Sequence, residues 1–154
     1  MIRVLFICLG NICRSPMAEA VMRDLVEKRG LSATIQVDSA GTSNWHEGES
    51  PHKGTRAKLQ EMRISTSGMK SRPLRTSDLE FDYLICMDTS NVLNTREILR
   101  APEHTKIIRF LDLTDHKKDV PDPWYTGDFQ ETYELCVDGC EALLNLIRQD
   151  HSLT

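Results

Sequence analysis

Short apolar segments alternate with segments of helical periodicity along nearly the whole chain, and this alternation restricts the possible folds more than any other feature. The apolar segments, which we predict to be strands, are residues 4–8, 34–40, 82–87 and 106–110. The helical segments between them are residues 16–29, 53–62 and 90–100. The first apolar segment is continuous, as is typical of a strand buried on both faces of a sheet.

A long loop over residues 113–127 precedes the strongest helical pattern, for which Asp128 and Glu131 are the expected cap. That helix has an apolar stripe made of Phe129, Tyr133, Cys136, Cys140, Leu143, Leu144 and Ile147. Strands that alternate with helices are usually parallel and joined by right-handed crossovers. The sequence therefore predicts one domain over residues 1–154 with a three-layer α/β fold, in which helices flank a four-stranded parallel sheet on both faces.

Composition narrows the possible partners and locations. The formal net charge of −4 argues against nucleic acid as the main partner, because it leaves no broad basic surface. No apolar segment is long enough for membrane insertion, and the first residues lack a signal-peptide pattern, so we expect a cytoplasmic protein. Export by a route without a signal peptide would leave no trace in the sequence. The odd number of cysteines, five, does not suggest a disulfide framework, and we expect Cys136 and Cys140 to be buried.

The loop that follows the first predicted strand has the form C-x5-R-S, running from Cys8 to Ser15. Ligands of parallel α/β sheets bind at the carboxyl ends of the strands. A short loop that leads into a helix presents backbone N–H groups to an anion, and the helix dipole favours negative charge there. Gly10 and Asn11 tolerate positive φ, while Ser15 and Pro16 suit a helix cap and first helical position. The residues expected to bind phosphate here are Leu9, Gly10, Asn11, Ile12, Cys13 and Ser15.

Cys8 and Arg14 carry the chemistry that we predict for this loop. We expect the positive potential of the loop to favour the thiolate of Cys8, which would then be a nucleophile facing a bound phosphate. Ser15 can donate a hydrogen bond to the sulfur and ease its departure in a second step. Arg14 has a planar guanidinium that binds two phosphoryl oxygens at once.

The late loop offers a general acid. Asp122 lies between two prolines, so its backbone is stiff, and a carboxylic acid there can protonate the leaving oxygen of an aryl phosphate. Trp124 and Tyr125 follow it and can flank a flat aromatic group. Asp119 and Asp128 are less constrained alternatives for the same role.

These segments resemble a known family. Residues 4–20, VLFICLGNICRSPMAEA, are similar to the signature of the low-molecular-weight protein tyrosine phosphatases. Residues 122–125, DPWY, are similar to the general-acid motif of that family, and the resemblance extends to residues 38–42 and 82–88. Together these motifs span nearly the whole chain.

The resemblance implies a hydrolase that acts on phosphotyrosine proteins and aryl phosphates without a metal or other cofactor. Cys8 would attack phosphorus to give a phosphocysteine while Asp122 protonates the tyrosine oxygen, and Asp122 would then activate water to release inorganic phosphate. Asn11, supported by Ser39, would hold the loop in shape. The residue matching Cys13 can form a disulfide with the nucleophile, which implies reversible inhibition by peroxide.

Two further positions follow from the resemblance. Trp45 corresponds to an aromatic residue at the rim of the substrate site. Many members of the family carry a histidine where this chain has Met69, and that histidine supports the serine–asparagine pair. With Met69 in that place, the resemblance implies the reaction type but not the rigidity of the phosphate loop. The five histidines show no ligand spacing and are expected to be solvated.

Three alternative functions share parts of these motifs. An arsenate reductase of the same fold needs two further cysteines in a mobile segment after the third strand, whereas here Cys86 lies within the strand pattern and the next cysteine is Cys136. Protein arginine phosphatases tend to carry threonine in place of Ile12 and lack the aromatic pair of the acid loop. A non-enzymatic phosphate-binding module or phosphocysteine carrier would keep the loop but would not need Asp122.

Overall fold

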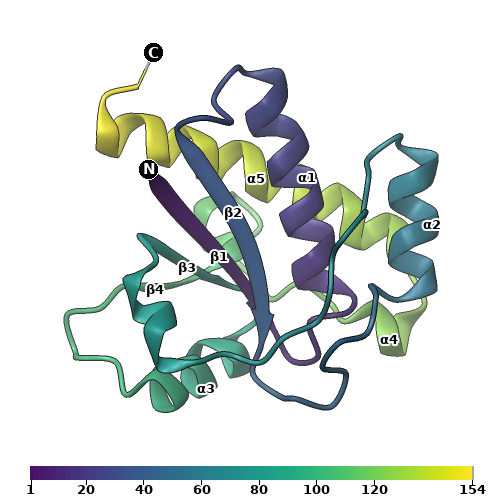
Figure 1. Cartoon of the computed structure of the whole chain (residues 1–154), viewed down its shortest axis with the longest axis horizontal. Coiled ribbons are helices and arrows are strands. Elements are labelled where there is room, and N and C mark those ends of the chain that lie inside the picture. The colour runs from purple at the N-terminus through teal and green to yellow at the C-terminus, as the bar shows by residue number, and fades with distance from the viewer. Residues whose placement is uncertain (154) are drawn as a thin grey trace.

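Within residues 1–153, which a computed structural model describes, the chain forms a four-stranded parallel sheet (Figure 1). The strands are β1 (Ile2–Cys8), β2 (Ile35–Gly41), β3 (Tyr83–Cys86) and β4 (Ile107–Arg109). Their order in the sheet is β2-β1-β3-β4, and every neighbouring pair is parallel. The predicted α/β fold is confirmed.

The four long helices agree with the predicted helical segments. They are α1 (Arg14–Lys28), α2 (Lys53–Glu61), α3 (Thr89–Leu99) and α5 (Phe129–His151). The sequence did not predict three short helices, which are η1 (Thr76–Glu80), η2 (Phe110–Leu113) and α4 (Pro123–Thr126). They are too short to show a period, and the last of them lies in a segment that we expected to be loop.

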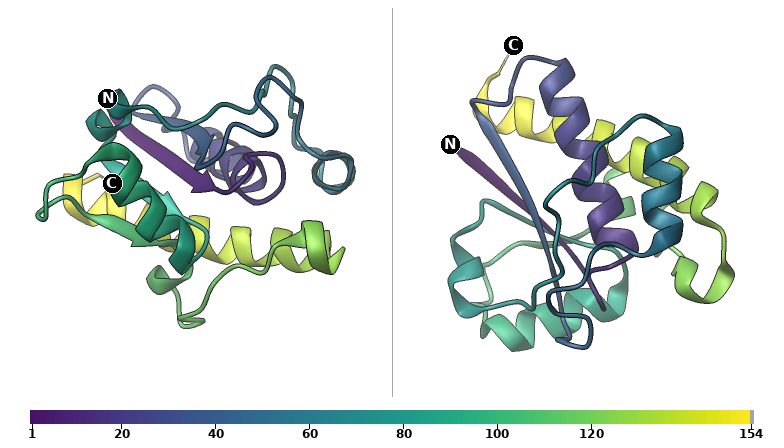
Figure 2. Two further views of the ribbon diagram at one scale, coloured as in Figure 1. Left: turned by 90° about the horizontal axis from the view of Figure 1, so that it is seen from below. Right: turned by 45° about the vertical axis from the view of Figure 1, so that its right-hand side comes forward.

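Each face of the sheet has its own hydrophobic core, because successive strand residues point to opposite sides. Val4 and Phe6 pack on the side of α1 and α5, where the ring of Phe110 meets Phe6 edge-on. Leu5 and Ile7 pack on the other side with Leu99 of α3. The two further views show α1 and α5 together on one side of the strands and α3 apart from them (Figure 2). The predicted three-layer arrangement is thus present.

The start of α1 differs from the prediction. The helix begins at Arg14, so Ser15 and Pro16 lie inside its first turn rather than at the cap and first position. Cys13 is the capping residue and makes no side-chain cap hydrogen bond. The hydroxyl of Ser15 is engaged elsewhere, with Cys8 and Asn11. The start of α5 agrees better, because the carboxylate of Asp128 accepts a hydrogen bond from the Glu131 N–H at 2.8 Å.

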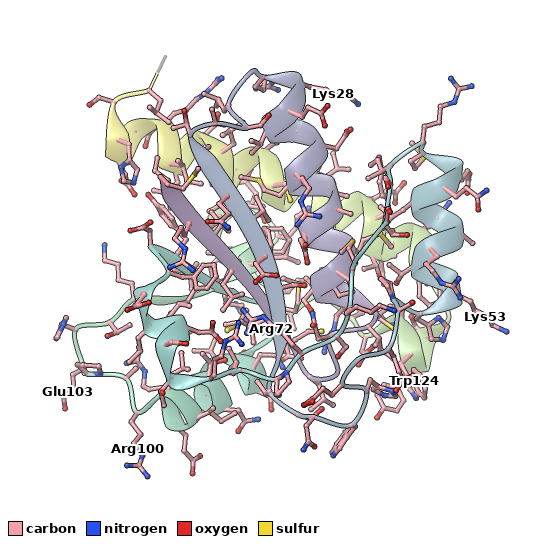
Figure 3. The ribbon with its side chains drawn as sticks, in the orientation of Figure 1. Lys28, Lys53, Arg72, Arg100, Glu103 and Trp124 are labelled. Carbon is pink, nitrogen blue, oxygen red and sulfur yellow. The ribbon has the colours of Figure 1, made fainter. Side chains whose placement is uncertain are left out.

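The topology places the C-x5-R-S loop at the middle of the sheet end formed by the carboxyl ends of the strands. Strand β1 is an inner strand, so the loop that leaves it at Cys8 has β2 on one side and β3 on the other. Figure 3 shows Arg72 beside the carboxyl ends of these strands and Trp124 at α4. No helix within residues 1–153 combines the length and apolar character needed to cross a membrane.

Candidate active site

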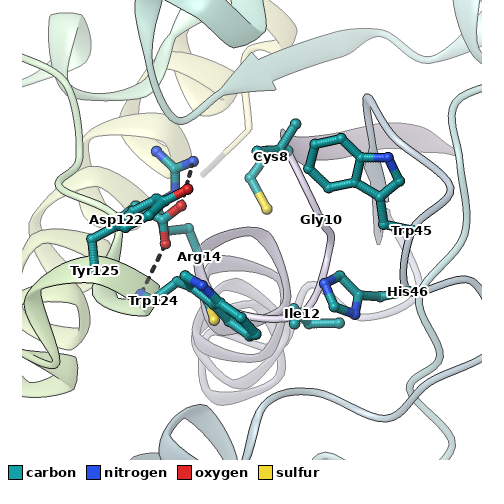
Figure 4. Close-up of a pocket in the computed structure, with 11 residues that line it drawn as sticks. Cys8, Gly10, Ile12, Arg14, Trp45, His46, Asp122, Trp124 and Tyr125 are labelled. Carbon is teal, nitrogen blue, oxygen red and sulfur yellow. Dashed lines mark hydrogen bonds and ion pairs between the residues drawn. The ribbon is translucent and has the colours of Figure 1, made fainter.

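A pocket of about 230 Å³ opens at the carboxyl edge of the sheet (Figure 4). It is lined by ten of the predicted site residues, which are Cys8, Leu9, Gly10, Ile12, Cys13, Arg14, Trp45, Asp122, Trp124 and Tyr125. His46 also lines it, although we expected the histidines to be solvated. The side chains of Asn11 and Ser15 lie behind the loop instead of lining the pocket.

Cys8 ends β1 and is only 3% exposed, so its sulfur is reached through the pocket alone. The Sγ atom lies 3.0 Å from the hydroxyl oxygen of Ser15. The carboxamide of Asn11 donates to that same oxygen at 2.8 Å, which leaves the Ser15 proton free to point at the sulfur. A thiolate at Cys8 therefore has a fixed hydrogen-bond donor beneath it.

Asn11 fixes the shape of the phosphate loop. Its backbone is left-handed, with φ of 56°, as the sequence predicted, and its side chain is buried. Besides Ser15, its Nδ2 donates to Ser39 Oγ at 2.9 Å, and its Oδ1 accepts from the backbone N–H of Arg72 at 3.0 Å. The expectation of positive φ was wrong for Gly10. A side chain at Gly10 would instead crowd the ring of His46, with its Cβ 3.1 Å from His46 Cδ2.

The support behind Asn11 ends in a carboxylate. The hydroxyl of Ser39 accepts from Asn11 and donates to Glu19 Oε1 at 2.5 Å, and Glu19 also contacts the guanidinium of Arg23. Burial raises the pKa of Glu19 above its ordinary value despite these hydrogen bonds. Met69, where many relatives were expected to carry histidine, is instead part of the hydrophobic core. The hydrogen-bonded support of the loop therefore runs from Asn11 through Ser39 to Glu19.

Arg14 is buried and held in place from three sides. Its Nη1 donates to Asp88 Oδ2 at 2.7 Å and to the Val120 carbonyl at 3.0 Å, and its Nη2 lies 3.5 Å from Asp122 Oδ2. Burial alone would lower the pKa of Arg14, but the charges of Cys8 and of both carboxylates raise it. The guanidinium is thus a fixed cation at the floor of the pocket. The anchoring role of Asp88 was not predicted, because only the fold brings it to Arg14.

Asp122 is aimed into the pocket by the short helix that follows it. It caps α4, with its Oδ1 accepting from the Trp124 N–H at 3.0 Å, while Oδ2 faces Arg14. Its side chain is 22% exposed, so a proton can be exchanged with solvent. Asp119, the sequence alternative, accepts hydrogen bonds from Thr89 outside the pocket. Asp128, the other alternative, caps α5.

Aromatic side chains form the rim of the pocket. Trp45 is 70% exposed, and Trp124 and Tyr125 of α4 stand on the other side of the opening (Figure 4). The rings of His46 and His52 both lie against Trp124, with centroids 5.7 and 5.5 Å away. Such a rim can sandwich a planar aryl group while the phosphate lies below it.

A sequence model described as the low molecular weight phosphotyrosine protein phosphatase family matches residues 3–153. The chain belongs to this family. The phosphatase YfkJ of Bacillus subtilis is 47% identical over 99% of this chain and 100% of its own length. The phosphatase PtpA of Staphylococcus saprophyticus is 45% identical over 99% of this chain and 98% of its own.

Solved structures of the phosphatase family agree with the fold. The crystal structure of YfkJ superposes with a TM-score of 0.94 at 48% identity, covering 97% of this chain and 96% of that one. The structure of an arginine phosphatase of Drosophila superposes with a TM-score of 0.86 at 30% identity, covering 96% and 98%. Both matches span nearly the whole chain.

The other cysteines of this phosphatase-family chain are buried thiols. Burial and the negative charge of the neighbouring Cys8 raise the pKa of Cys13 to about 12. Burial also raises the pKa of Cys86 to about 12. Cys136 and Cys140 are on the buried side of α5 and belong to the core, as predicted. Within residues 1–153, no three His, Cys, Asp or Glu side chains gather in a group able to hold a metal ion.

Proposed function

We propose that this protein hydrolyses phosphotyrosine in proteins, with Cys8 as nucleophile, Arg14 as phosphate-binding cation and Asp122 as general acid and base. The observation that carries the proposal is that these three side chains, from β1, α1 and the acid loop, line one pocket. The pocket combines a cationic floor with an aromatic rim, which suits an aryl phosphate better than an alkyl one.

In the first step, the Cys8 thiolate attacks phosphorus and the bond from phosphorus to the tyrosine oxygen breaks. Asp122 gives its proton to the departing oxygen, so that tyrosine leaves as the neutral phenol. Arg14 and the loop N–H groups, from Leu9, Gly10, Ile12, Cys13 and Ser15 among others, bind the phosphoryl oxygens throughout. Aligned N–H groups and a guanidinium stabilise the spread negative charge of the transition state.

In the second step, the Asp122 carboxylate takes a proton from water while the water oxygen attacks the phosphocysteine. The phosphorus–sulfur bond breaks, inorganic phosphate is released, and the sulfur leaves as a thiolate. The Ser15 hydroxyl, 3.0 Å from Sγ, stabilises that thiolate as it forms. The same hydrogen bond thus serves both the attack and the departure of sulfur.

Several observations favour phosphotyrosine over the alternatives. The similarity to tyrosine phosphatases, at 47% and 45% identity, exceeds the 30% identity to the Drosophila arginine phosphatase. Ile12 and the aromatic pair Trp124 and Tyr125 line the pocket, which is apolar where an aryl ring would lie. A reductase relay is not supported, because Cys86 is fully buried within β3 and the next cysteine lies deep in α5.

The proposal extends to the whole chain and to its location. We assign residues 1–154 to one phosphatase domain, since the site draws on β1, α1 and the loop before α4. We also assign the protein to the cytosol, where reducing conditions keep a catalytic thiol free.

Hydrolysis of a phosphotyrosine peptide by wild type, Cys8→Ser and Asp122→Ala, each in excess EDTA, tests the proposal. We expect wild-type turnover, none with Cys8→Ser, and a loss of about 10²–10⁴-fold in kcat with Asp122→Ala. Phosphate binding should survive in Asp122→Ala, because Arg14 and the loop are intact. A Cys8→Ser variant as active as wild type would refute the proposal.

A further inference from the structure

A groove of about 580 Å³ lies beside the phosphate pocket, between the loop that follows β2 and helix α3. It shares Leu9 and Trp45 with the phosphate pocket. The rest of its lining comes mainly from residues 42–44 and from Asn94, Glu97 and Ile98 of α3. We call it the side groove. Because Trp45 borders both cavities and neighbouring residues of an extended chain are only about 3.4 Å apart, a residue close to a bound phosphotyrosine reaches the side groove.

Hydrogen bonds fix one wall of the side groove to the phosphate loop. The Thr42 N–H donates to the Cys8 carbonyl at 2.9 Å, and the Ser43 N–H donates to the Leu9 carbonyl at 3.0 Å. The Ser43 hydroxyl donates to the same Leu9 carbonyl at 2.9 Å. The loop that carries Trp45 is therefore held against the phosphate loop, and a peptide bound in the pocket meets a groove that is already formed.

Apolar side chains line much of the side groove. They are Leu9, Trp45, Pro73 and Ile98. Trp45 is 70% exposed and Ile98 is 37% exposed, so both leave apolar surface in water that a partner can bury. Glu97 is the only ionisable residue in the lining, so the groove has no cation to pair with an acidic residue. These features favour an apolar side chain as the occupant.

The exposed apolar side chains of the protein gather around this part of the surface. Within residues 1–153, seven large apolar side chains are exposed. Four of the seven line the phosphate pocket or the side groove, namely Trp45, Ile98, Trp124 and Tyr125. Single exposed apolar residues are normal on a protein surface, whereas a group of them marks an interaction site. This group is continuous with the phosphate pocket, so the partner it fits is the protein that carries the phosphotyrosine.

We propose that the side groove binds an apolar side chain next to phosphotyrosine, so that the preferred substrates carry leucine or a similar residue beside the phosphorylated tyrosine. Burial of that side chain against Trp45 and Ile98 adds to the affinity for the substrate. This preference rests on the proposed phosphatase function and names its substrate class.

Three phosphotyrosine peptides that differ only in the residue on each side of phosphotyrosine test the preference. These residues are leucine, asparagine, which has a similar shape but is polar, or lysine. For wild type we expect kcat/KM to be about fivefold higher with leucine than with asparagine, as for partial burial of one leucine side chain. The preference should persist at high salt, because it does not depend on charge. A lysine peptide that exceeds the leucine peptide would indicate attraction by Glu97 instead and would overturn the proposal.

Two serine substitutions on α3 provide a matched pair. Ile98→Ser removes an apolar side chain from the side groove, whereas Leu93→Ser removes one from the same helix outside the groove, where Leu93 is 65% exposed. We expect Ile98→Ser to reduce the leucine-to-asparagine ratio from about fivefold to about twofold, and Leu93→Ser to leave the ratio as in wild type. Because each ratio is taken within one variant, a general change in turnover cancels.

The same peptides are also titrated against the Cys8→Ser protein by fluorescence anisotropy. Tighter binding of the leucine peptide there supports the side groove even if wild type fails to hydrolyse any peptide, a result that would overturn only the phosphatase function. Equal affinities and equal kcat/KM for leucine and asparagine would overturn the side groove, and so would an identical change of the ratio in Ile98→Ser and Leu93→Ser. Sedimentation tests a second copy of the chain as the occupant, because a wild-type dimer that dissociates in Ile98→Ser but not in Leu93→Ser would also overturn the proposal.

Discussion

Replacing Asn11 with alanine removes the side chain that fixes the phosphate loop. Asn11 makes three hydrogen bonds, to Ser15 Oγ, to Ser39 Oγ and from the Arg72 N–H, with lengths of 2.8, 2.9 and 3.0 Å. It also adopts a left-handed backbone, which asparagine tolerates better than alanine. We expect both features to contribute to stability and to loop geometry.

The size of the effect follows from these contacts. Each of the three hydrogen bonds contributes about 1 kcal/mol net, since two are buried and the third is partly buried. An alanine with positive φ adds about 1 kcal/mol of backbone strain. Asn11→Ala should therefore lower the free energy of unfolding by about 4 kcal/mol. Asn11→Gly loses the same hydrogen bonds without the strain and should lower it by about 3 kcal/mol.

Urea unfolding of wild type, Asn11→Ala and Asn11→Gly measures these losses, and p-nitrophenyl phosphate hydrolysis measures the effect on the site. We expect kcat/KM to fall about 10²-fold in both variants, because the donors and Sγ lose their alignment. An alanine variant more stable than the glycine variant would refute the strain argument. Losses below about 1 kcal/mol in both would refute the role of the hydrogen bonds.

Three other predictions concern the core, the pH dependence and the redox response. Gly139→Ala should lower the free energy of unfolding by about 1–3 kcal/mol, although alanine favours helices, because its methyl group would overlap the Phe110 ring. Adding Phe110→Leu to the same chain should recover part of this loss, and urea unfolding measures both. The contribution of Cys13 and Cys86 to the free energy of unfolding should be constant up to about pH 9.0 and fall as pH rises from there toward about 12. The unfolded chain loses these protons at the ordinary pKa of 9.0, whereas the folded chain holds them. Urea titrations in reductant check this, and a free energy of unfolding that does not fall above pH 9.0 would contradict it. Mild peroxide should inactivate wild type reversibly and Cys13→Ala irreversibly, because only wild type can form a Cys8–Cys13 disulfide. The activity recovered with dithiothreitol measures this, and equal recovery in both proteins would argue against the disulfide.

The sequence predicted those features that depend on neighbours along the chain. The strand-to-helix order and the C-x5-R-S loop are local, so the parallel sheet and the positions of Cys8 and Arg14 followed from them. The short helix α4 was not predicted, because one turn has no period. It forms because Asp122 caps it and Pro123 suits its first position.

The features that were missed depend on contacts between distant segments. Asp88 lies 74 positions from Arg14 and is brought to it only by the pairing of β1 with β3. His46 reaches the pocket because the loop after β2 folds over Gly10, and no spacing in the sequence signals that approach. Glu19 appeared as an ordinary helix residue, and its buried hydrogen bond to Ser39 exists only because α1 packs beside β2.

The most direct test of the central claim is to identify the atom that carries the phosphoryl group during turnover. Asp122→Ala should accumulate the intermediate with p-nitrophenyl phosphate, because this substrate has a good leaving group and the second step lacks its base. Phosphorus NMR after quenching in alkaline denaturant should show a thiophosphate ester, and digestion should locate it on the peptide containing Cys8. Phosphate on any other residue, or the same signal from Cys8→Ser, would contradict the account.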